Sequence, residues 1–395
     1  MAPARRHPRS SFAAMGAKEE TLPARRAAEA HLAVMKRISK RVGRMRGIVY
    51  TEKNPAQEQR EETMPVVNES SYISPVWLRN GHLQTIWPVL FRNPPLPALW
   101  RERLETPDGD FIDIDHIPAS AGIRSRRVAI LSHGLEGDSR KRYMLGMAKA
   151  LNRRGWDVVA RNFRGCSGEP NRKASLYHSG ETDDLHLVVE HCAALGYIHI
   201  VLVGFSMGGN QTLKYLGERE RTIPAQVRAA VAVSVPCDLE GAAHVLSRPS
   251  RAPYMAYFLR TLRLKIESKH ARFPDLIDIR GLKHVRSFLE FDTRYTAPLH
   301  GFTSARHYWR ESGCLRLLKN IDVPFLLINA ADDPFLSDEC YPLRVAEFNK
   351  AMTLEMPLWG GHVGFVSPGH DLYWSEQRAA DFLGSVCDGL NRTFH

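Results

Sequence analysis

The sequence lacks any apolar run long enough to cross a membrane and any paired cysteine motif. No apolar stretch among its 395 residues approaches the roughly 18 residues of a membrane-spanning helix. The cysteines show neither a Cys-x-x-Cys pair nor a regular spacing, and they are Cys166, Cys192, Cys237, Cys314, Cys340 and Cys387. These absences argue against membrane-spanning helices, a disulfide framework and a cysteine-ligated zinc site. We therefore expect reduced thiols in a cytoplasmic protein.

An excess of acidic or basic charge is also missing from most of the chain. The formal net charge is +11, but residues 1–65 alone hold 14 Lys and Arg against 7 acidic residues. The remainder holds 40 basic residues against 36 acidic ones. This balance does not indicate a nucleic-acid surface on the globular part, and we expect no nucleic-acid partner.

Residues 1–65 form a basic arm without the periodicity of a packed element. We expect the arm to be mostly disordered, with a transient basic amphipathic helix at residues 25–38. The alternatives are a peripheral contact with a membrane surface or with nucleic acid, or an Arg-rich presequence, against which the acids Glu19, Glu20 and Glu29 argue. Met64 precedes the first globular-looking sequence, so a gene start annotated too far upstream is a further alternative.

The pentapeptide Gly-Phe-Ser-Met-Gly at residues 204–208 stands between two predicted elements. The apolar run at residues 199–203 predicts a buried strand, and residues 210–216 predict a helix. Between a strand and a helix, the G-x-S-x-G pattern forms a sharp turn that exposes the serine hydroxyl at the top of the sheet. We therefore predict that Ser206 is a nucleophile.

Two downstream segments offer the partners that a serine nucleophile needs. Residues 323–329 predict a buried strand that leads to Asp332 and Asp333, and an acid at this place orients the base. We favour Asp333, because the Pro-Phe that follows resembles the usual pattern after such an acid, and we interpret Asp332 as a residue of the turn. The strand predicted at residues 352–356 leads to His362 in a Gly-Gly-His-x-Gly loop, so we predict that His362 is the base.

An upstream loop offers the donors for an oxyanion. The strand predicted at residues 128–131 is followed by a His-Gly loop at residues 133–137. Such a loop donates one backbone N–H, and the residue after the nucleophile donates the second. We predict that Leu135 and Met207 are these donors, and we interpret His133 as a structural member of the loop. No metal and no organic cofactor is implied.

The globular part, residues 66–395, alternates between strands and helices. Further strands are predicted at residues 111–116, 157–160 and 229–234, and helices at residues 143–153 and 183–194 and after Ser206. This alternation predicts an α/β fold, with a mostly parallel sheet, helices on both faces and a ligand site at the carboxyl ends of the strands.

Residues about 239–319, between the sixth strand and the strand that carries the acid, break the alternation. We expect a largely helical insertion that caps the site, and the alternative is a set of packing helices at the sheet edge. Apolar residues of this region are expected to line an acyl pocket, and they include Phe258, Leu259, Phe288, Leu289, Tyr295 and Phe302.

Four parts of the sequence resemble the YheT-like α/β-hydrolases, the AB hydrolase 4 type. They are residues 74–88, residues 162–170 with 177–185, residues 291–302 and residues 330–335. The resemblance covers about residues 70–390 and implies an α/β-hydrolase fold in which Ser206, Asp333 and His362 form the triad. It assigns no catalytic role to His82 or Gln84, for which we expect a structural role.

The resemblance also implies an activity. The group includes bacterial esterase-like proteins, fungal medium-chain acyltransferases and esterases, and animal members that act on phospholipid acyl chains. The animal members usually carry a membrane anchor, and we expect none here, because no apolar run of this sequence is long enough. We expect hydrolysis of carboxylic esters, with medium-chain acyl or lipid-like substrates and an acyl-enzyme on Ser206. The alternatives are an alcohol O-acyltransferase that uses the same residues and a non-catalytic binding protein on this fold. The oligomeric state is left open.

Overall fold

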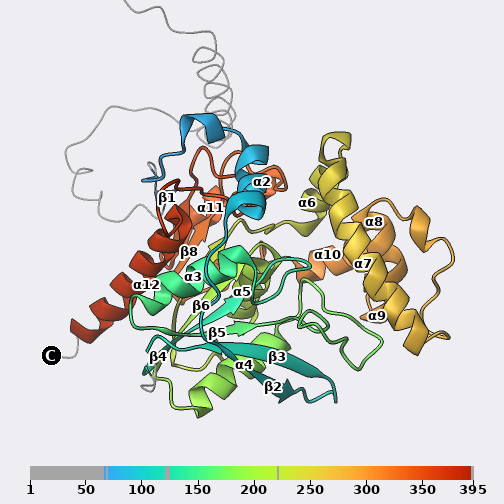
Figure 1. Ribbon diagram of the computed structural model, residues 1–395, viewed down its shortest axis with the longest axis horizontal. Helices are drawn as coiled ribbons and strands as arrows, with labels where there is room; N and C mark the ends of the chain where they lie inside the picture. The colour runs from blue at the N-terminus through green and yellow to red at the C-terminus, as the bar shows by residue number, and fades with distance from the viewer. Residues whose placement is uncertain (1–65, 68–69, 121–124, 220–221, 393–395) are drawn as a thin grey trace, which may run out of the picture. The chain divides into compact units, whose positions relative to one another are not determined.

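The computed structural model describes residues 66–67, 70–120, 125–219 and 222–392. In these residues nine strands form one sheet in the order β1-β9-β8-β7-β6-β4-β5-β3-β2 (Figure 1). The strands are β1 Val66–Val67, β2 Trp100–Glu105, β3 Phe111–Ile117, β4 Arg127–Ser132, β5 Asp157–Arg161, β6 His199–Phe205, β7 Val227–Val233, β8 Phe325–Ile328 and β9 Met352–Glu355. Neighbours from β1 to β5 in this order are parallel, whereas β3 is antiparallel to β5 and β2 is antiparallel to β3. The predicted mostly parallel sheet is confirmed.

Helices cover both faces of the sheet, as predicted. One face carries α3 Arg142–Asn152 and α12 Trp374–Arg392, and the other carries α4 Asp183–Ala194 and α5 Met207–Glu218. Two further helices are α2 Gly81–Phe91 and α11 Leu343–Phe348, and short 3₁₀ turns lie at Val76–Leu78, Pro249–Arg251, Leu282–His284, Leu318–Asn320 and Asp338–Cys340. No helix in the described residues is long and apolar enough to span a lipid bilayer.

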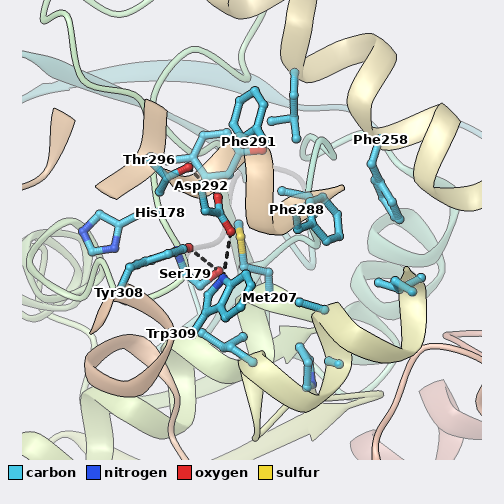
Figure 2. A pocket seen from close by; sticks show the side chains of 18 of the residues that line it. His178, Ser179, Met207, Phe258, Phe288, Phe291, Asp292, Thr296, Tyr308 and Trp309 are labelled. Atoms are coloured by element: carbon cyan, nitrogen blue, oxygen red, sulfur yellow. Dashed lines mark hydrogen bonds between the residues drawn. The ribbon is translucent and has the colours of Figure 1, made fainter. Parts of the chain in front are cut away.

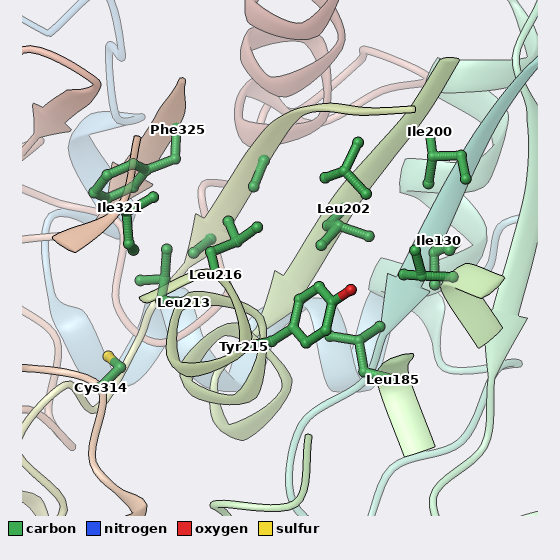
Figure 3. Close-up of a cluster of buried hydrophobic side chains, with 14 of the residues drawn as sticks. Ile130, Leu185, Ile200, Leu202, Leu213, Tyr215, Leu216, Cys314, Ile321 and Phe325 are labelled. Carbon is green, nitrogen blue, oxygen red and sulfur yellow. The ribbon is translucent and has the colours of Figure 1, made fainter. Parts of the chain in front are cut away.

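Alternation along the central strands divides the core between the two faces. In β4, Ile130 packs with α4 and α5, whereas its neighbour Leu131 packs with α3 and α12. Figure 3 shows the first of these clusters, in which Ile130, Leu202 and Tyr215 come together. Successive side chains of a strand point to opposite faces, so a strand buried on both sides has the continuous apolar run that identified β6 in the sequence.

The sequence pattern did not predict β2, because four of its six residues are charged. Arg101 and Arg103 pair with Asp115 and Asp113 of β3, each with an N–O distance of 2.8 Å. Cross-strand pairs of opposite charge stabilise an antiparallel edge, but such a segment has the composition of a solvated loop. The two-residue β1 and the helices α2 and α12 were also not predicted.

The insertion follows β7, which is the sixth strand if the two-residue β1 is left out. It is largely helical, and its elements are α6 Leu239–Leu246, α7 Ala252–Arg272, α8 Phe288–Phe291, a π-helical turn Asp292–Thr296, α9 Ala297–Leu299 and α10 Ala305–Ser312. It has a core of its own, in which Leu259, Ile266 and Phe291 are buried. The predicted insertion is confirmed.

Candidate active site

The turn between β6 and α5 presents Ser206. This residue has φ 52° and ψ −119°, the left-handed region that is strained for any residue with a side chain. A Cβ on Gly204 would collide with the carbonyl group of Gly208, and a Cβ on Gly208 would collide with the carbonyl oxygen of His133. The two glycines are therefore required by space, and the turn brings Ser206 into the wall of a pocket.

Ser206, His362 and Asp333 lie in one hydrogen-bonded line. The distance from His362 Nε2 to Ser206 Oγ is 2.9 Å, and that from His362 Nδ1 to Asp333 Oδ2 is 2.8 Å. The Asp333 carboxylate is fully buried, and its other oxygen accepts a hydrogen bond from the backbone N–H of Phe335 at 2.9 Å. In this arrangement the imidazole can take the hydroxyl proton while the carboxylate holds its Nδ1–H.

Helix α2 holds the loop that carries His362. Thr85 Oγ1 accepts a hydrogen bond from the His362 backbone N–H at 2.9 Å and donates one to the Gly81 carbonyl oxygen at 2.6 Å. On the same loop, the N–H of Val363, a residue with φ 57°, donates to Ser234 Oγ at 2.9 Å. Sequence reasoning missed Thr85, although it lies within one of the four segments that carry the family resemblance.

Gln84 has the structural role expected of it. Its side chain is fully buried, donates to the hydroxyl groups of Tyr72 and Ser74, and accepts from the backbone N–H of Val366. His82 lies at the helix surface, with its Nδ1 at 3.0 Å from the hydroxyl oxygen of Tyr254 in the cap.

Asp332 belongs to the turn and does not contact the imidazole. Its Oδ1 accepts from the Gly361 N–H at 2.9 Å, and its Oδ2 is buried with no hydrogen-bond partner in the described residues. Gly81 packs directly against its backbone. Burial raises the pKa of the Asp332 carboxyl to about 7. Asp333 is therefore the one of the two acids that lies in position to orient His362.

We predict that Asp332→Asn stabilises the protein, and that the gain grows with pH. The pKa of Asp332 is raised on folding, so the ionised form is disfavoured in the folded state. The free-energy cost of ionising this buried carboxyl is absent at pH values below the pKa of the unfolded chain, and it is complete at pH values above about 7. The asparagine side chain does not ionise, so the substitution removes this cost. The cost is about 1.4 kcal/mol for each unit by which the folded and unfolded pKa values differ. Urea unfolding of both proteins at several values of pH measures the gain, and a gain independent of pH would contradict the prediction.

The His-Gly loop lies against Ser206. A Cβ on Gly134 would be 3.2 Å from the Ser206 Cβ, and the Gly134 N–H donates to the Tyr143 hydroxyl at 3.0 Å. Glu136, with φ 55°, donates its N–H to the Tyr177 hydroxyl at 3.0 Å. Leu135, between these two fixed positions, lines the pocket together with Met207 and Ser206. Leu135, one of the two predicted oxyanion donors, is thus carried by backbone that is held on both sides.

His133 uses both ring nitrogens inside the protein. Its Nδ1 donates to the Gly134 carbonyl oxygen at 2.7 Å, and its Nε2 accepts from the Phe163 N–H at 3.1 Å. Complete burial lowers the pKa of His133 to about 3, so the ring is neutral. A neutral ring with both nitrogens engaged fixes the shape of the loop, as interpreted from the sequence.

The pocket around Ser206 is mostly apolar and lies under the insertion (Figure 2). Side chains of α6, α7 and α8 form much of its wall, and they are Leu239, Ala242, Ala243, Leu246, Phe258, Leu262, Phe288 and Phe291. The insertion is therefore a cap over the site and not a set of edge helices.

Part of the predicted lining was wrong. Three of the six apolar residues expected to face the pocket do so, namely Phe258, Phe288 and Tyr295. Leu259 packs in the core of the cap, Leu289 is 42% exposed, and the Phe302 ring contacts the tilted ring of Tyr308. Adjacent positions of a helix point about 100° apart, so Leu259 and Leu289 turn away from the pocket that Phe258 and Phe288 face.

One side of the pocket wall is polar. Asp292, the first residue of the π-helical turn, accepts hydrogen bonds from Thr296 Oγ1 at 2.6 Å and from Trp309 Nε1 at 2.8 Å (Figure 2). Burial raises the pKa of Asp292 to about 6. His178 and Tyr308 line the same pocket. Sequence reasoning assigned no role to Asp292, although π-helical turns are frequent at functional sites.

Residues of the types that bind metals come together at another place. Glu102 of β2, His116 of β3 and His191 of α4 each offer a ligand atom, and these atoms lie within 4.8 Å of one another. The Glu102 carboxylate pairs with the imidazoles of His116 at 2.7 Å and of His191 at 3.2 Å. None of the three residues lines the Ser206 pocket.

Comparison with known proteins identifies the family. Residues 129–368 match the family described as alpha/beta hydrolase fold. The chain is 37% identical to the YheT protein of Escherichia coli (strain K12) over 77% of its length and 90% of that protein. It is 30% identical to "Phospholipase ABHD3" of Mus musculus, over 78% of this chain and 75% of that protein, and 25% identical to "Monoacylglycerol lipase ABHD2" of Bos taurus, over 80% of each. The chain therefore belongs to the α/β-hydrolase family, in the YheT-like group that its motifs resemble.

Proposed function

We propose that the protein is a serine hydrolase that cleaves carboxylic esters through an acyl-enzyme on Ser206. The observation that carries the proposal is the line from Asp333 through His362 to Ser206, which ends on the wall of an apolar pocket. The names of two relatives, a phospholipase and a monoacylglycerol lipase, support an ester bond as the target.

In the proposed reaction, His362 Nε2 takes the hydroxyl proton while Ser206 Oγ attacks the ester carbonyl carbon. The backbone N–H groups of Leu135 and Met207 hold the oxyanion that forms. The imidazolium, which Asp333 stabilises, gives its proton to the leaving alcohol as the carbon–oxygen bond breaks. A water molecule then repeats the sequence on the acyl-enzyme and releases the carboxylic acid.

The pocket supports a substrate with an acyl chain. Its wall is built from aliphatic and aromatic side chains of the cap, and each methylene that it removes from water contributes about 0.8 kcal/mol. An acetyl group would leave most of this apolar wall unused. We therefore propose medium-chain acyl or lipid-like esters as the substrates.

This assignment predicts how the rate depends on chain length. From acetyl to medium-chain p-nitrophenyl esters, kcat/KM should rise by up to about fourfold for each added methylene, the factor that corresponds to 0.8 kcal/mol. It should fall once the chain exceeds the pocket. A flat profile, or a maximum at the acetyl ester, would contradict it. Repeating the series with ethanol present, and measuring the ethyl ester formed, separates hydrolysis from transfer to an alcohol.

A bulky side chain in the pocket provides a second measurement. Ala243 lines the pocket, whereas Ala256 of α7 is exposed and lies outside it. Ala243→Phe should move the optimum to shorter chains and preserve activity on the acetyl ester, and the matched control Ala256→Phe should leave the profile unchanged.

A further inference from the structure

Large apolar side chains are exposed around α2. Six of them, Ile73, Val76, Trp77, Val89, Leu90 and Phe91, are each between 51% and 85% exposed, and we call them the α2 surface. Ring contacts join its two parts, because Trp87 lies 4.6 Å from Trp77 and 4.2 Å from Phe91, measured between ring centroids. Exposed apolar side chains gathered in this way mark an interaction site, since monomeric proteins rarely expose large contiguous patches.

The core of the protein does not account for the apolar composition of α2. The helix contains no charged residue, and only Gly81 and Gln84 in it are buried. Gly81 and Thr85 serve the His362 loop, and Gln84 serves the segment beside it. The residues toward the end of the helix, Val89 to Phe91, stay in water although a polar sequence would satisfy the same fold. Their apolar character therefore points to a partner with an apolar interior.

The charged residues in the segment that carries this surface are all basic. Residues 70–101 contain no Asp or Glu, and Arg79, next to the Trp77 turn, is exposed. In the cap helix α7, Tyr257 and Leu264 are exposed together with Arg260. Aromatic rings, aliphatic side chains and arginines in one region fit a bilayer of anionic phospholipids, whose headgroups attract cations and whose acyl region accepts apolar groups.

The first turn of α2 lies beside α7, the cap helix that borders the pocket. His82 of α2 stacks on Tyr254 of α7, with 5.7 Å between the ring centroids, and Tyr254 packs against Phe335 at 4.8 Å. Phe335 lines the pocket, and its ring lies 4.2 Å from that of His362. Figure 1 shows α2 on the same side of the sheet as α6 and the start of α7. A bilayer seated on this surface would therefore adjoin the cap.

We propose that the α2 surface binds the protein to anionic phospholipid bilayers and so brings the pocket to lipid esters. The purpose of the contact rests on the proposed ester hydrolysis, but the binding itself does not. Two other occupants are conceivable on chemical grounds, the basic residues 1–65 and a second copy of the chain, and the experiment separates them from a bilayer.

The experiment measures flotation of the full-length protein with vesicles of phosphatidylcholine and phosphatidylglycerol. Leu90→Ser with Phe91→Ser should lower the vesicle-bound partition coefficient by about tenfold or more, because two exposed apolar side chains no longer enter the bilayer. The matched control is Ile198→Ser with Phe348→Ser. These two exposed apolar residues lie just before β6 and β9, at the ends of the strands that are opposite to the candidate site. The control pair should bind as the unchanged protein does.

An arm variant, sedimentation and ester hydrolysis distinguish a bilayer from the other two occupants. Replacing the arm residues Arg25, Arg26, Lys36 and Arg37 by alanine should leave most of the binding intact, and a loss confined to this variant would overturn the proposal in favour of the arm. Failure of the unchanged protein to float, or a dimer in sedimentation that only Leu90→Ser with Phe91→Ser dissociates, would overturn it too. Hydrolysis of a soluble p-nitrophenyl ester, expected to be equal in all variants, reports on the fold and tests the proposed function separately.

Discussion

Ser206→Ala is expected to lower kcat for ester hydrolysis by a factor on the order of 10⁵–10⁶, the scale known for loss of a serine nucleophile. The substitution removes the attacking oxygen and leaves the rest of the site in place. The hydroxyl accounts for one hydrogen bond in the described residues, to His362, so we expect little change in the free energy of unfolding. Rates with a p-nitrophenyl butyrate substrate and thermal melting of the purified variant measure both effects.

A second serine of the pocket gives the matched control. Ser179 also lines the pocket, and its Oγ accepts a hydrogen bond from the Tyr308 hydroxyl. Ser179→Ala should retain most of the activity, because its hydroxyl is bonded to a tyrosine and not to a base. Equal losses in the two variants would mean that the pocket is sensitive to any change, and full activity of Ser206→Ala would place the nucleophile elsewhere.

Asp333→Asn is expected to lower kcat by a factor on the order of 10⁴, as in related triads. An asparagine can turn its NH₂ group toward His362 Nδ1, and the ring would then carry its proton on Nε2. In that tautomer Nε2 faces Ser206 Oγ as a donor and cannot accept the hydroxyl proton. The side chain hardly changes in size, so the loss of activity reports on the tautomer of His362 and not on packing.

The neighbouring acid is the control for this prediction. Asp332→Asn should keep most of the activity, because the Asp332 carboxylate accepts from the Gly361 N–H and does not reach the imidazole. Steady-state kinetics of both variants on the same ester decide the question. A larger loss in Asp332→Asn than in Asp333→Asn would show that the acid of the triad is Asp332.

The central features of the candidate site could be predicted because they are local in the sequence. The turn at Ser206 depends on a strand, a glycine on each side and a helix, all within a few residues, and Asp333 and His362 each follow their own strand. The contact between Thr85 and the His362 backbone joins residues 277 positions apart. No periodicity encodes such a pair, so the sequence pattern could indicate the segment around Thr85 but not its task.

The cap shows a second limit of sequence patterns. Apolar residues of a helix indicate that the helix is buried, but α7 borders both the core of the cap and the pocket. Phe258 faces the pocket and Leu259 faces the core, and composition cannot distinguish the two. Composition also fails for α2, whose apolar sequence would suggest burial although its outer side chains are exposed.

The most direct test of the account is to map the site of reaction with a fluorophosphonate, a reagent that requires an activated serine. After the native protein reacts, mass spectrometry of its peptides should find one adduct, on Ser206. The adduct should be absent after prior unfolding and should form far more slowly in Asp333→Asn. No adduct in the native protein, or an adduct on another serine, would contradict the proposal that Ser206 is the nucleophile of an esterase.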